Sequence, residues 1–311
     1  MTAADGGTWS IGELAGRAGV TVKTVRYYSD RGLLPEAGRS GGGHRRYGSG
    51  ALVRLREIRS LRALGLGVAE VARALEDDGR LAEVVAGELR GVARERAALA
   101  WREASLRLLA ECDGVERAEL LPLLGASVLP PDLDEVVRFW RRSLPVRLPA
   151  PLVTRVLDEV VPVPPDDPSP GQVRAFARLG ALVADPAPGR APGPPLRGER
   201  YRPAVLYEGL GEAYDLAGAE ALAGRPPAGR EALDCFADAY ALALGERDSP
   251  LFRRRLAELL GREETAVMAR YWKLVVPLLP ADRPALGLLH HHLTEALTPA
   301  DRLTGLTGLT D

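Results

Sequence analysis

The distribution of proline constrains this chain more than any other feature of its sequence. Of the 25 prolines in 311 residues, only Pro35 lies before residue 121. Because proline interrupts the interior of a helix, the stretch 48–120 can form long continuous helices, whereas the remainder must be broken into shorter segments. Proline clusters near 161–170 and 185–203 predict loops that divide this remainder.

Charge separates the same parts of the chain. Residues 17–62 hold 11 Lys and Arg against 3 Asp and Glu, whereas residues 79–311 hold 29 basic and 33 acidic residues. The overall net charge of −1 therefore hides a basic head on a mildly acidic body. This balance excludes a uniformly basic protein that coats nucleic acid.

The basic head begins with two short helices. Ser10 and Glu13 have the spacing of a capping box, which predicts the start of a first helix. Gly19 suits a tight turn, and Thr21 can cap a second helix over 22–30. Two short helices joined by a turn of three or four residues form a helix-turn-helix.

The second helix of such a unit enters the major groove of DNA, and its N-terminal residues reach the bases. Its exposed candidates are Thr21, Lys23, Thr24, Arg26 and Tyr27. Cations suit phosphates and guanines, and hydroxyls suit phosphate oxygens. Of the two adjacent tyrosines, we expect Tyr28 to be the buried one.

A hairpin follows the two helices. The glycine-rich stretch 38–43 lies between two short segments, and the second segment carries Arg45 and Arg46. This pattern predicts a two-stranded wing that lies along a phosphate backbone. A third helix over 51–64 and a fourth over 68–75 complete the head.

The order of these motifs resembles the DNA-binding domain of MerR-family transcription regulators. The resemblance rests on WSIGELAxxAGVTVKTVRYYxxxGLLP from residue 9, then GxRRY, then IRSLRxLG, and it covers residues 9–78 strongly. It implies a winged helix-turn-helix at 1–78. By position it also implies DNA contacts from Lys23, Arg26 and Tyr27, from Arg45 and Tyr47 in the wing, and from Arg62.

The resemblance also implies a mechanism. In that family a dimer binds a pseudo-palindromic promoter whose elements are spaced too far apart. When an effector binds, the dimer bends and untwists the DNA, so that RNA polymerase can engage the promoter. Deforming DNA in this way costs a few kcal/mol.

Residues 79–112 contain no proline and carry Val85, Val92, Leu99 and Leu106 at seven-residue intervals. Such a stripe is typical of a coiled-coil seam. The resemblance places the antiparallel dimerisation helix of the family at this position, so we expect a homodimer. The alternative is an amphipathic helix that packs on its own domain.

Residues 113–311 show no convincing alternation of period two, and we interpret them as an all-helical domain. About 200 residues exceed what dimerisation needs, which favours a sensor domain. The resemblance implies that its effector is a small organic molecule, because larger members of the family carry a C-terminal pocket for such compounds. Aromatic side chains suit flat apolar ligands, and the pairs Phe139–Trp140 and Tyr271–Trp272 are the candidates. The alternatives are a protein partner, a nucleotide messenger bound by Arg253, Arg254 and Arg255, or a repressor without ligand.

Other chemistries receive little support. Metal-sensing members of the family place a second cysteine soon after the dimerisation helix, but the stretch 113–125 after Cys112 contains none. Consecutive residues of a helix point about 100° apart, so His290, His291 and His292 cannot converge on one ion. No phosphate loop, HExxH or GxSxG motif occurs. We therefore expect no enzyme, no metal and no cofactor.

The sequence also bears on location. The N-terminal residues show no basic region followed by an apolar run, and no stretch of about 18 apolar residues occurs. Two cysteines, Cys112 and Cys235, are too few for a disulfide scaffold. These features predict a cytoplasmic protein without a membrane span.

Overall fold

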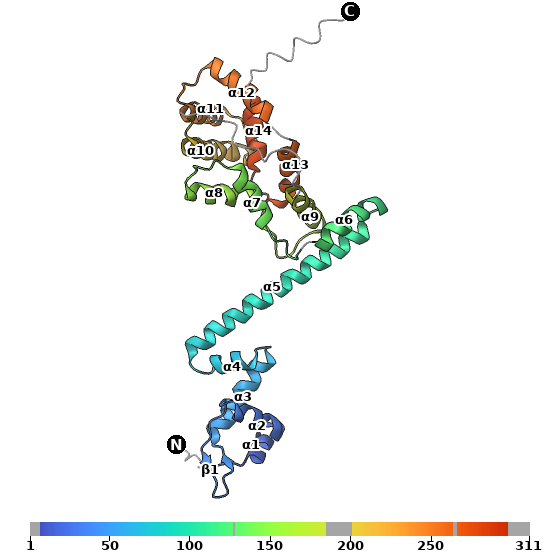
Figure 1. Cartoon of the computed structure of the whole chain (residues 1–311), viewed down its shortest axis with the longest axis vertical. Coiled ribbons are helices and arrows are strands. Elements are labelled where there is room, and N and C mark those ends of the chain that lie inside the picture. The colour runs from blue at the N-terminus through green and yellow to red at the C-terminus, as the bar shows by residue number, and fades with distance from the viewer. Residues whose placement is uncertain (1–6, 127, 185–200, 264–265, 298–311) are drawn as a thin grey trace, which may run out of the picture. The chain divides into compact units, whose positions relative to one another are not determined.

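A computed structural model describes residues 7–126, 128–184, 201–263 and 266–297. The chain forms two compact units, Met1–Glu95 and Arg96–Asp311. The boundary between them falls inside one long helix, α5 (Asp78–Glu111). Apart from one hairpin, the regular structure of the described residues is helical, which confirms the predicted fold class (Figure 1).

The N-terminal unit begins with a helix-turn-helix and a hairpin. Its elements before α5 are α1 (Ile11–Ala18), α2 (Val22–Asp30), β1 (Gly38–Arg39), β2 (Arg45–Arg46), α3 (Ser49–Ala63) and α4 (Val68–Ala74). Ser10 caps α1 through a complete capping box with Glu13. Gly19 ends α1 with a φ of 63°, a left-handed conformation that glycine adopts without strain. These features confirm the helix-turn-helix predicted from the sequence.

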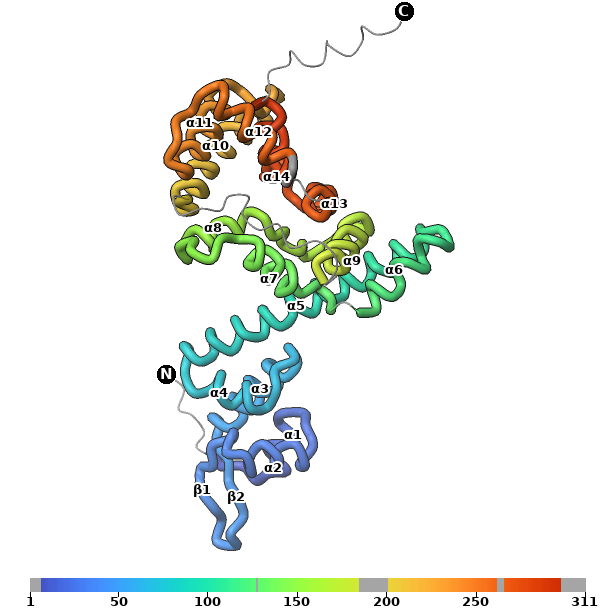
Figure 2. Tube along the Cα trace, turned by 45° about the horizontal axis from the view of Figure 1, so that its top comes forward, coloured from blue at the N-terminus to red at the C-terminus, as the bar shows by residue number. Residues whose placement is uncertain are grey.

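The hairpin is short and closes on the start of the unit. β1 and β2 pair antiparallel with Arg39 opposite Arg45, and Figure 2 shows the hairpin loop extending beyond α2. Gly43 lies in this loop at a φ of 80°. Trp9 pairs with Tyr47 through two backbone hydrogen bonds of 2.7 and 2.9 Å, so a third short segment extends the ladder. The predicted wing is therefore present.

One core holds the N-terminal unit together. The inner faces of α1, α2 and α3 contribute Leu14, Val25, Leu55 and Ile58, each with no exposed surface. Tyr28 is also buried, as expected, whereas Tyr27 is 42% exposed. Packing of these apolar faces fixes the orientation of α2 relative to the hairpin.

The C-terminal unit is built from helices alone within the described residues. After α5 the elements are α6 (Gly114–Ala126), α7 (Asp134–Ser143), α8 (Ala150–Val160), α9 (Pro170–Ala184), α10 (Pro203–Leu222), α11 (Arg230–Leu244), α12 (Pro250–Glu263), α13 (Ala266–Val275), the short 3-10 helix η1 (Val276–Leu278) and α14 (Leu286–Ala296). The predicted loop near 161–170 is observed between α8 and α9. The predicted loop at 185–203 lies, up to residue 200, outside the described residues. α6 continues through Pro122, so this proline does not interrupt the helix.

Two large apolar clusters form the core of this unit. The first joins the end of α5 to α7, α9 and α13 around Trp101, Phe176 and Tyr271. The second joins α10, α11, α12 and α14 around Phe236 and Tyr240. α10 and α11 lie side by side (Figures 1 and 2), and a Cβ at Gly209 would stand 2.6 Å from that of Ala239. Gly209 therefore permits this close approach of the two helices.

No helix among the described residues is long and apolar enough to cross a membrane.

Candidate nucleic-acid interface and ligand cavity

The second helix of the helix-turn-helix presents a basic outer face. Thr21 caps α2, since its hydroxyl accepts a 3.1 Å hydrogen bond from the Thr24 amide. With the inner face buried against the core, the side chains of Lys23, Arg26 and Tyr27 point outward and are exposed. The structure thus brings these predicted residues together on one accessible face.

The Tyr27 ring on this face also contacts a cation. The guanidinium of Arg31 lies 4.3 Å from the centre of the Tyr27 ring. This distance is typical of a cation–π contact. Arg31, which the sequence did not single out, therefore adds a further charge beside the predicted residues.

Arg45, the predicted contact of the wing, is paired with carboxylates. Arg45 is ion-paired with Asp30 of α2 and, at 2.7 Å, with Glu36. The hydrogen bond to Asp30 raises the pKa of Arg45. These contacts tie the wing to α2 and offset the charge of Arg45. Arg39, directly opposite it in the hairpin, has a side chain that is 62% exposed and is the more accessible cation.

Tyr47 requires a correction. This predicted DNA contact has no exposed surface, and its hydroxyl makes a 2.8 Å hydrogen bond with the buried hydroxyl of Ser29. A side chain inside the core cannot reach a phosphate, so Tyr47 is a structural residue that joins β2 to α2. Sequence spacing could not show this, because the partner lies 18 positions away.

Arg62 is exposed but already has a structural contact. Its guanidinium donates a hydrogen bond to the carbonyl of Leu66, just beyond the end of α3. Arg59, one turn earlier, donates a 2.5 Å hydrogen bond to the carbonyl of Ala18 at the end of α1. The carbonyls at the end of a helix lack partners inside the helix, and Arg59 satisfies one of them at the end of α1, whereas Arg62 holds the loop between α3 and α4.

Helix α5 carries exposed apolar side chains at the predicted intervals. The exposed fractions are 38% for Val85, 52% for Val92, 64% for Leu99 and 60% for Leu106. Leu89 is exposed as well, at 65%. We call these five residues the α5 stripe. Trp101 and Leu108 of the same helix are buried in the first apolar cluster of the C-terminal unit, so another face of α5 already has its partners.

A cavity of about 300 Å³ lies within the C-terminal unit. Its walls come from α7, α8, α10, α11, α12, α13 and α14, and they are mainly aromatic and aliphatic. The aromatic and histidine side chains that line it are Trp140, Tyr201, Tyr207, Tyr214, Tyr240, Trp272, His290 and His291. A volume of this size is at the lower end of the range for sites that hold drug-sized molecules.

Only half of the predicted aromatic candidates line this cavity. Trp140 and Trp272 form part of the wall, with ring centres 5.9 Å apart. Phe139 and Tyr271 stack on each other at 5.7 Å in the layer behind. The Tyr271 hydroxyl donates a 2.7 Å hydrogen bond to the Val160 carbonyl, so it is held in the core. The sequence did not single out the three tyrosines at 201, 207 and 214.

Burial sets the protonation of the polar groups in the wall. The Tyr214 hydroxyl lies 2.7 Å from Nδ1 of His290. Desolvation lowers the pKa of His290 to about 4 and raises the pKa of Tyr214. It also raises the pKa of Tyr201 to about 12. All three groups are therefore uncharged near neutral pH, and the wall presents neutral polar groups to the cavity.

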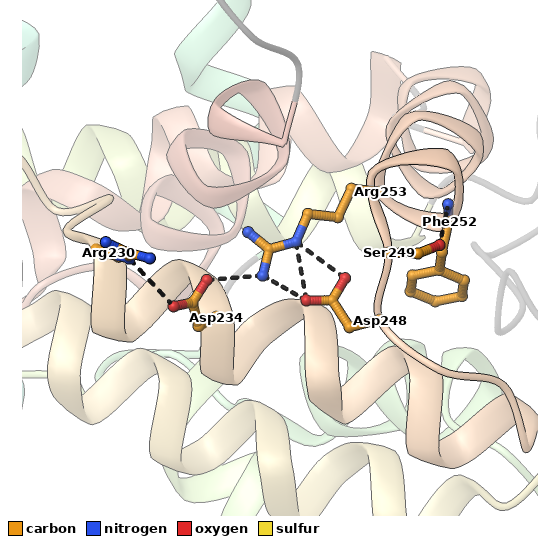
Figure 3. A network of polar contacts seen from close by, with 6 residues as sticks. All are labelled: Arg230, Asp234, Asp248, Ser249, Phe252 and Arg253. Carbon is orange, nitrogen blue, oxygen red and sulfur yellow. Dashed lines mark hydrogen bonds and ion pairs between the residues drawn. The ribbon is translucent and has the colours of Figure 1, made fainter.

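The arginine cluster considered for a phosphorylated ligand is engaged elsewhere. Arg253 lies between Asp248 and Asp234, with its Nη2 at 2.5 and 2.7 Å from their carboxylates (Figure 3). Arg255 is ion-paired with Glu246. Neither lines the cavity. This arrangement joins α11 to the start of α12 and leaves no array of free guanidinium groups for a phosphate.

Metal ligands do not come together in the described residues. Cys112 is buried, and burial raises the pKa of its thiol. The three consecutive histidines diverge: His290 faces Tyr214, whereas Nε2 of His291 lies 3.4 Å from Glu295. Within the described ranges, no group of three or more His, Cys, Asp or Glu side chains has the geometry to hold a metal ion.

Comparison with known proteins gives the N-terminal unit a family. The family model described as MerR HTH family regulatory protein matches residues 9–78. Nodulation protein NolA of Bradyrhizobium sp. (strain NC92) is 49% identical over 72 residues, which cover 23% of this chain and 30% of that protein. The HTH-type transcriptional activator TipA of Streptomyces coelicolor is 49% identical over 70 residues, which cover 22% of this chain and 28% of that protein.

A third relative is matched over most of its length. The mercuric resistance operon regulatory protein of Shigella flexneri is 34% identical over 123 residues, which cover 38% of this chain and 85% of that protein. The chain thus spans less than a third of the NolA and TipA proteins but most of this shorter regulator. The motifs of the first 78 residues, their folded form and this match agree. The chain belongs to the MerR family of helix-turn-helix regulatory proteins.

Proposed function

We propose that this protein is a sequence-specific DNA-binding transcription regulator. The observation that carries the proposal is the winged helix-turn-helix, whose second helix presents Lys23, Arg26 and Tyr27 on an exposed face. A helix of this kind fits the major groove, and the hairpin wing can follow the adjacent phosphates. The names of its relatives describe regulators of transcription or of an operon. No catalytic role is proposed.

The regulator acts as a homodimer. The α5 stripe leaves five large apolar side chains in water, and a second copy of α5 in antiparallel orientation would cover them. A two-fold axis between the copies matches a palindromic promoter site. Bending and untwisting of that site would then change its use by RNA polymerase.

A small organic effector controls this change. The support is the cavity of the C-terminal unit, which is mainly apolar and is lined by a few polar and charged side chains. A nucleotide messenger has less support because Arg253 and Arg255 are already paired with carboxylates. A protein partner and a repressor without ligand stay as the alternatives.

Measuring binding to selected DNA duplexes tests the proposed DNA-binding surface. Sites are enriched from a random duplex pool with the full-length protein, and affinity is then measured over a range of salt concentrations. Replacing Lys23 and Arg26 together by alanine should weaken binding by at least tenfold and lower the salt slope by about one to two. Arg141→Ala, an exposed arginine of α7, is the matched control and should change neither quantity. Unchanged binding by the double variant would refute the assigned surface.

Measuring the oligomeric state tests the proposed homodimer. Leu99→Glu with Leu106→Glu places two charges in the α5 stripe and should convert a dimer into a monomer in analytical ultracentrifugation. Leu222→Glu is the control, because this leucine of α10 is 57% exposed and lies outside the stripe. A dimer that persists in the double variant would show that another surface joins the two chains.

A further inference from the structure

The cavity of the C-terminal unit contains a buried polar atom that the fold does not satisfy. The hydroxyl oxygen of Tyr201 is buried and has no hydrogen-bond partner among the described residues. A buried polar group without a hydrogen-bond partner destabilises the folded state. Since Tyr201 lines the cavity, a ligand in the cavity can supply the missing partner.

Two glycines shape the walls of the cavity. A Cβ at Gly287 of α14 would lie 2.2 Å from three atoms of the Trp272 indole, so this ring lies directly on the helix backbone. A Cβ at Gly211 of α10 would lie 3.1 Å from Nη2 of Arg155. Glycine at these positions lets the Trp272 indole and the Arg155 guanidinium approach the backbones of α14 and α10 closely.

The charges at the cavity favour an anion over a cation. Arg155 is exposed and makes no ion pair among the described residues. Among the described residues, Glu159 supplies the carboxylate that lines the cavity, and this carboxylate is ion-paired at 2.8 Å with Arg283. A cationic ligand would meet the unpaired positive charge of Arg155 and no unpaired carboxylate. Aromatic rings alone attract cations, but the charge of Arg155 opposes this effect.

We propose that the cavity binds a planar aromatic anion. Its ring system lies between Trp140 and Trp272 on one side and the tyrosines of α10 on the other. A polar group of the ligand hydrogen-bonds to the Tyr201 hydroxyl, and its acidic group pairs with Arg155. This proposal rests on the proposed function only in that such an anion would be the effector.

A matched pair of fluorescent probes tests the proposal with the full-length protein and no DNA. Anilinonaphthalene sulfonate is an aromatic anion, and phenylnaphthylamine has the same rings and amine without the sulfonate. We expect both to bind with one site per chain, and the anion to bind about tenfold more tightly. A planar cationic dye should bind more weakly than either.

Variants locate the binding. Arg155→Met keeps the length of the side chain and should remove the tenfold preference for the anion without changing the affinity of phenylnaphthylamine. Arg141→Met is the matched control and should leave both affinities unchanged. Tyr201→Phe should lower the affinity for both probes several-fold, because both carry the amine that would hydrogen-bond to the hydroxyl. The unfolding temperature should stay the same or rise. A hydroxyl with a purely structural role would instead lower the unfolding temperature and leave both affinities unchanged.

Each other outcome overturns the proposal. Equal affinities of the two probes, or an anion affinity that survives Arg155→Met, would show that the cavity does not select an anion. Tighter binding of the cationic dye would reverse the assigned charge. No saturable binding of any probe would show that the cavity is not a ligand site. Because DNA is absent, these results are independent of the DNA-binding test, and either proposal can fail alone.

Discussion

The two units of this chain place their polar side chains in opposite positions. In the N-terminal unit, the cations of α2 and β1 face outward, and the buried hydroxyls of Ser29 and Tyr47 satisfy each other. In the C-terminal unit, polar groups face an internal cavity, and the Tyr201 hydroxyl is left without a partner. This contrast supports the two proposals: DNA binding by the exposed cations of the first unit, and binding of a small molecule in the cavity of the second.

The two sites also differ in how well the sequence alone can predict them. The outward face of α2 comes from residues within one helix, so its period and its cap predict it. The cavity collects side chains from seven helices between residues 140 and 294. No local pattern connects these positions, because packing alone brings them together.

The largest expected loss of stability comes from a substitution in the core of the N-terminal unit, compared with one on its surface. Tyr47→Ala removes a fully buried ring and leaves the Ser29 hydroxyl unpaired, so it should lower the free energy of unfolding of this unit by about 3–5 kcal/mol. Hydrogen exchange of the α2 and α3 amides in the full-length protein measures this change. Tyr27→Ala, on the exposed face, should change protection by less than about 1 kcal/mol. Equal effects of the two variants would contradict the assignment of Tyr47 to the core.

The next effect tests the neutral interior of the C-terminal unit. The folded chain protonates His290 only near pH 4, whereas an unfolded histidine binds a proton below about 6.5. The unfolded state therefore takes up more protons as the pH falls from 6.5 to 4. Stability from this group is complete above pH 6.5 and is lost toward pH 4, by on the order of 3 kcal/mol.

Thermal unfolding across this pH range measures the contribution of His290. Trp101, Trp140 and Trp272 make tryptophan fluorescence a probe mainly of the C-terminal unit. His290→Gln keeps a hydrogen-bonding group near Tyr214 and should flatten the loss of stability between pH 6.5 and 4. His292→Gln, at an exposed position of the same helix, should leave the profile unchanged. A profile that is equally steep in both variants would show that His290 is not the responsible group.

A smaller effect distinguishes a partly buried ion cluster from a surface pair. Arg253→Leu leaves Asp248 without its partner, and this side chain is only 20% exposed. We expect a loss of about 1.5–3 kcal/mol in the same fluorescence measurement. Arg255→Leu breaks the ion pair with Glu246. The side chains of Arg255 and Glu246 are 58% and 42% exposed, so this loss should lower the free energy of unfolding by less than about 1 kcal/mol. If the two losses were equal, the cluster in Figure 3 would be no more than a surface contact.

Particular residues show how far the sequence predicted the structure. The caps at Ser10 and Thr21 follow from contacts three residues apart, so the sequence alone predicted them. Tyr47 was assigned wrongly because its partner Ser29 is distant in the chain. Arg45 was predicted as a DNA contact, but ion pairs with Asp30 and Glu36 engage it, and no spacing rule predicts such pairs.

The cavity shows the same limit. Adjacent residues of a helix point about 100° apart, so the pairs Phe139–Trp140 and Tyr271–Trp272 could not both face one space. One member of each pair lines the cavity, and the other is in the core. Tyr207 and Tyr214 are seven residues apart and share a face of α10, a signal that could have identified them.

The smallest effect concerns the part that the sequence predicted best. Thr21→Ala removes the hydroxyl that accepts from the Thr24 amide at the start of α2, and it should lower the stability of the N-terminal unit by about 1 kcal/mol. Thr21→Ser keeps the cap and should restore most of this loss. Because the amide at a helix N-terminus also binds phosphate, DNA binding separates two roles. If Thr21 only caps the helix, the loss of DNA-binding free energy in Thr21→Ala should be no larger than the loss of stability measured by hydrogen exchange. A larger loss of affinity that Thr21→Ser reverses would make this hydroxyl a direct contact and would extend the basic surface of α2 to its first turn.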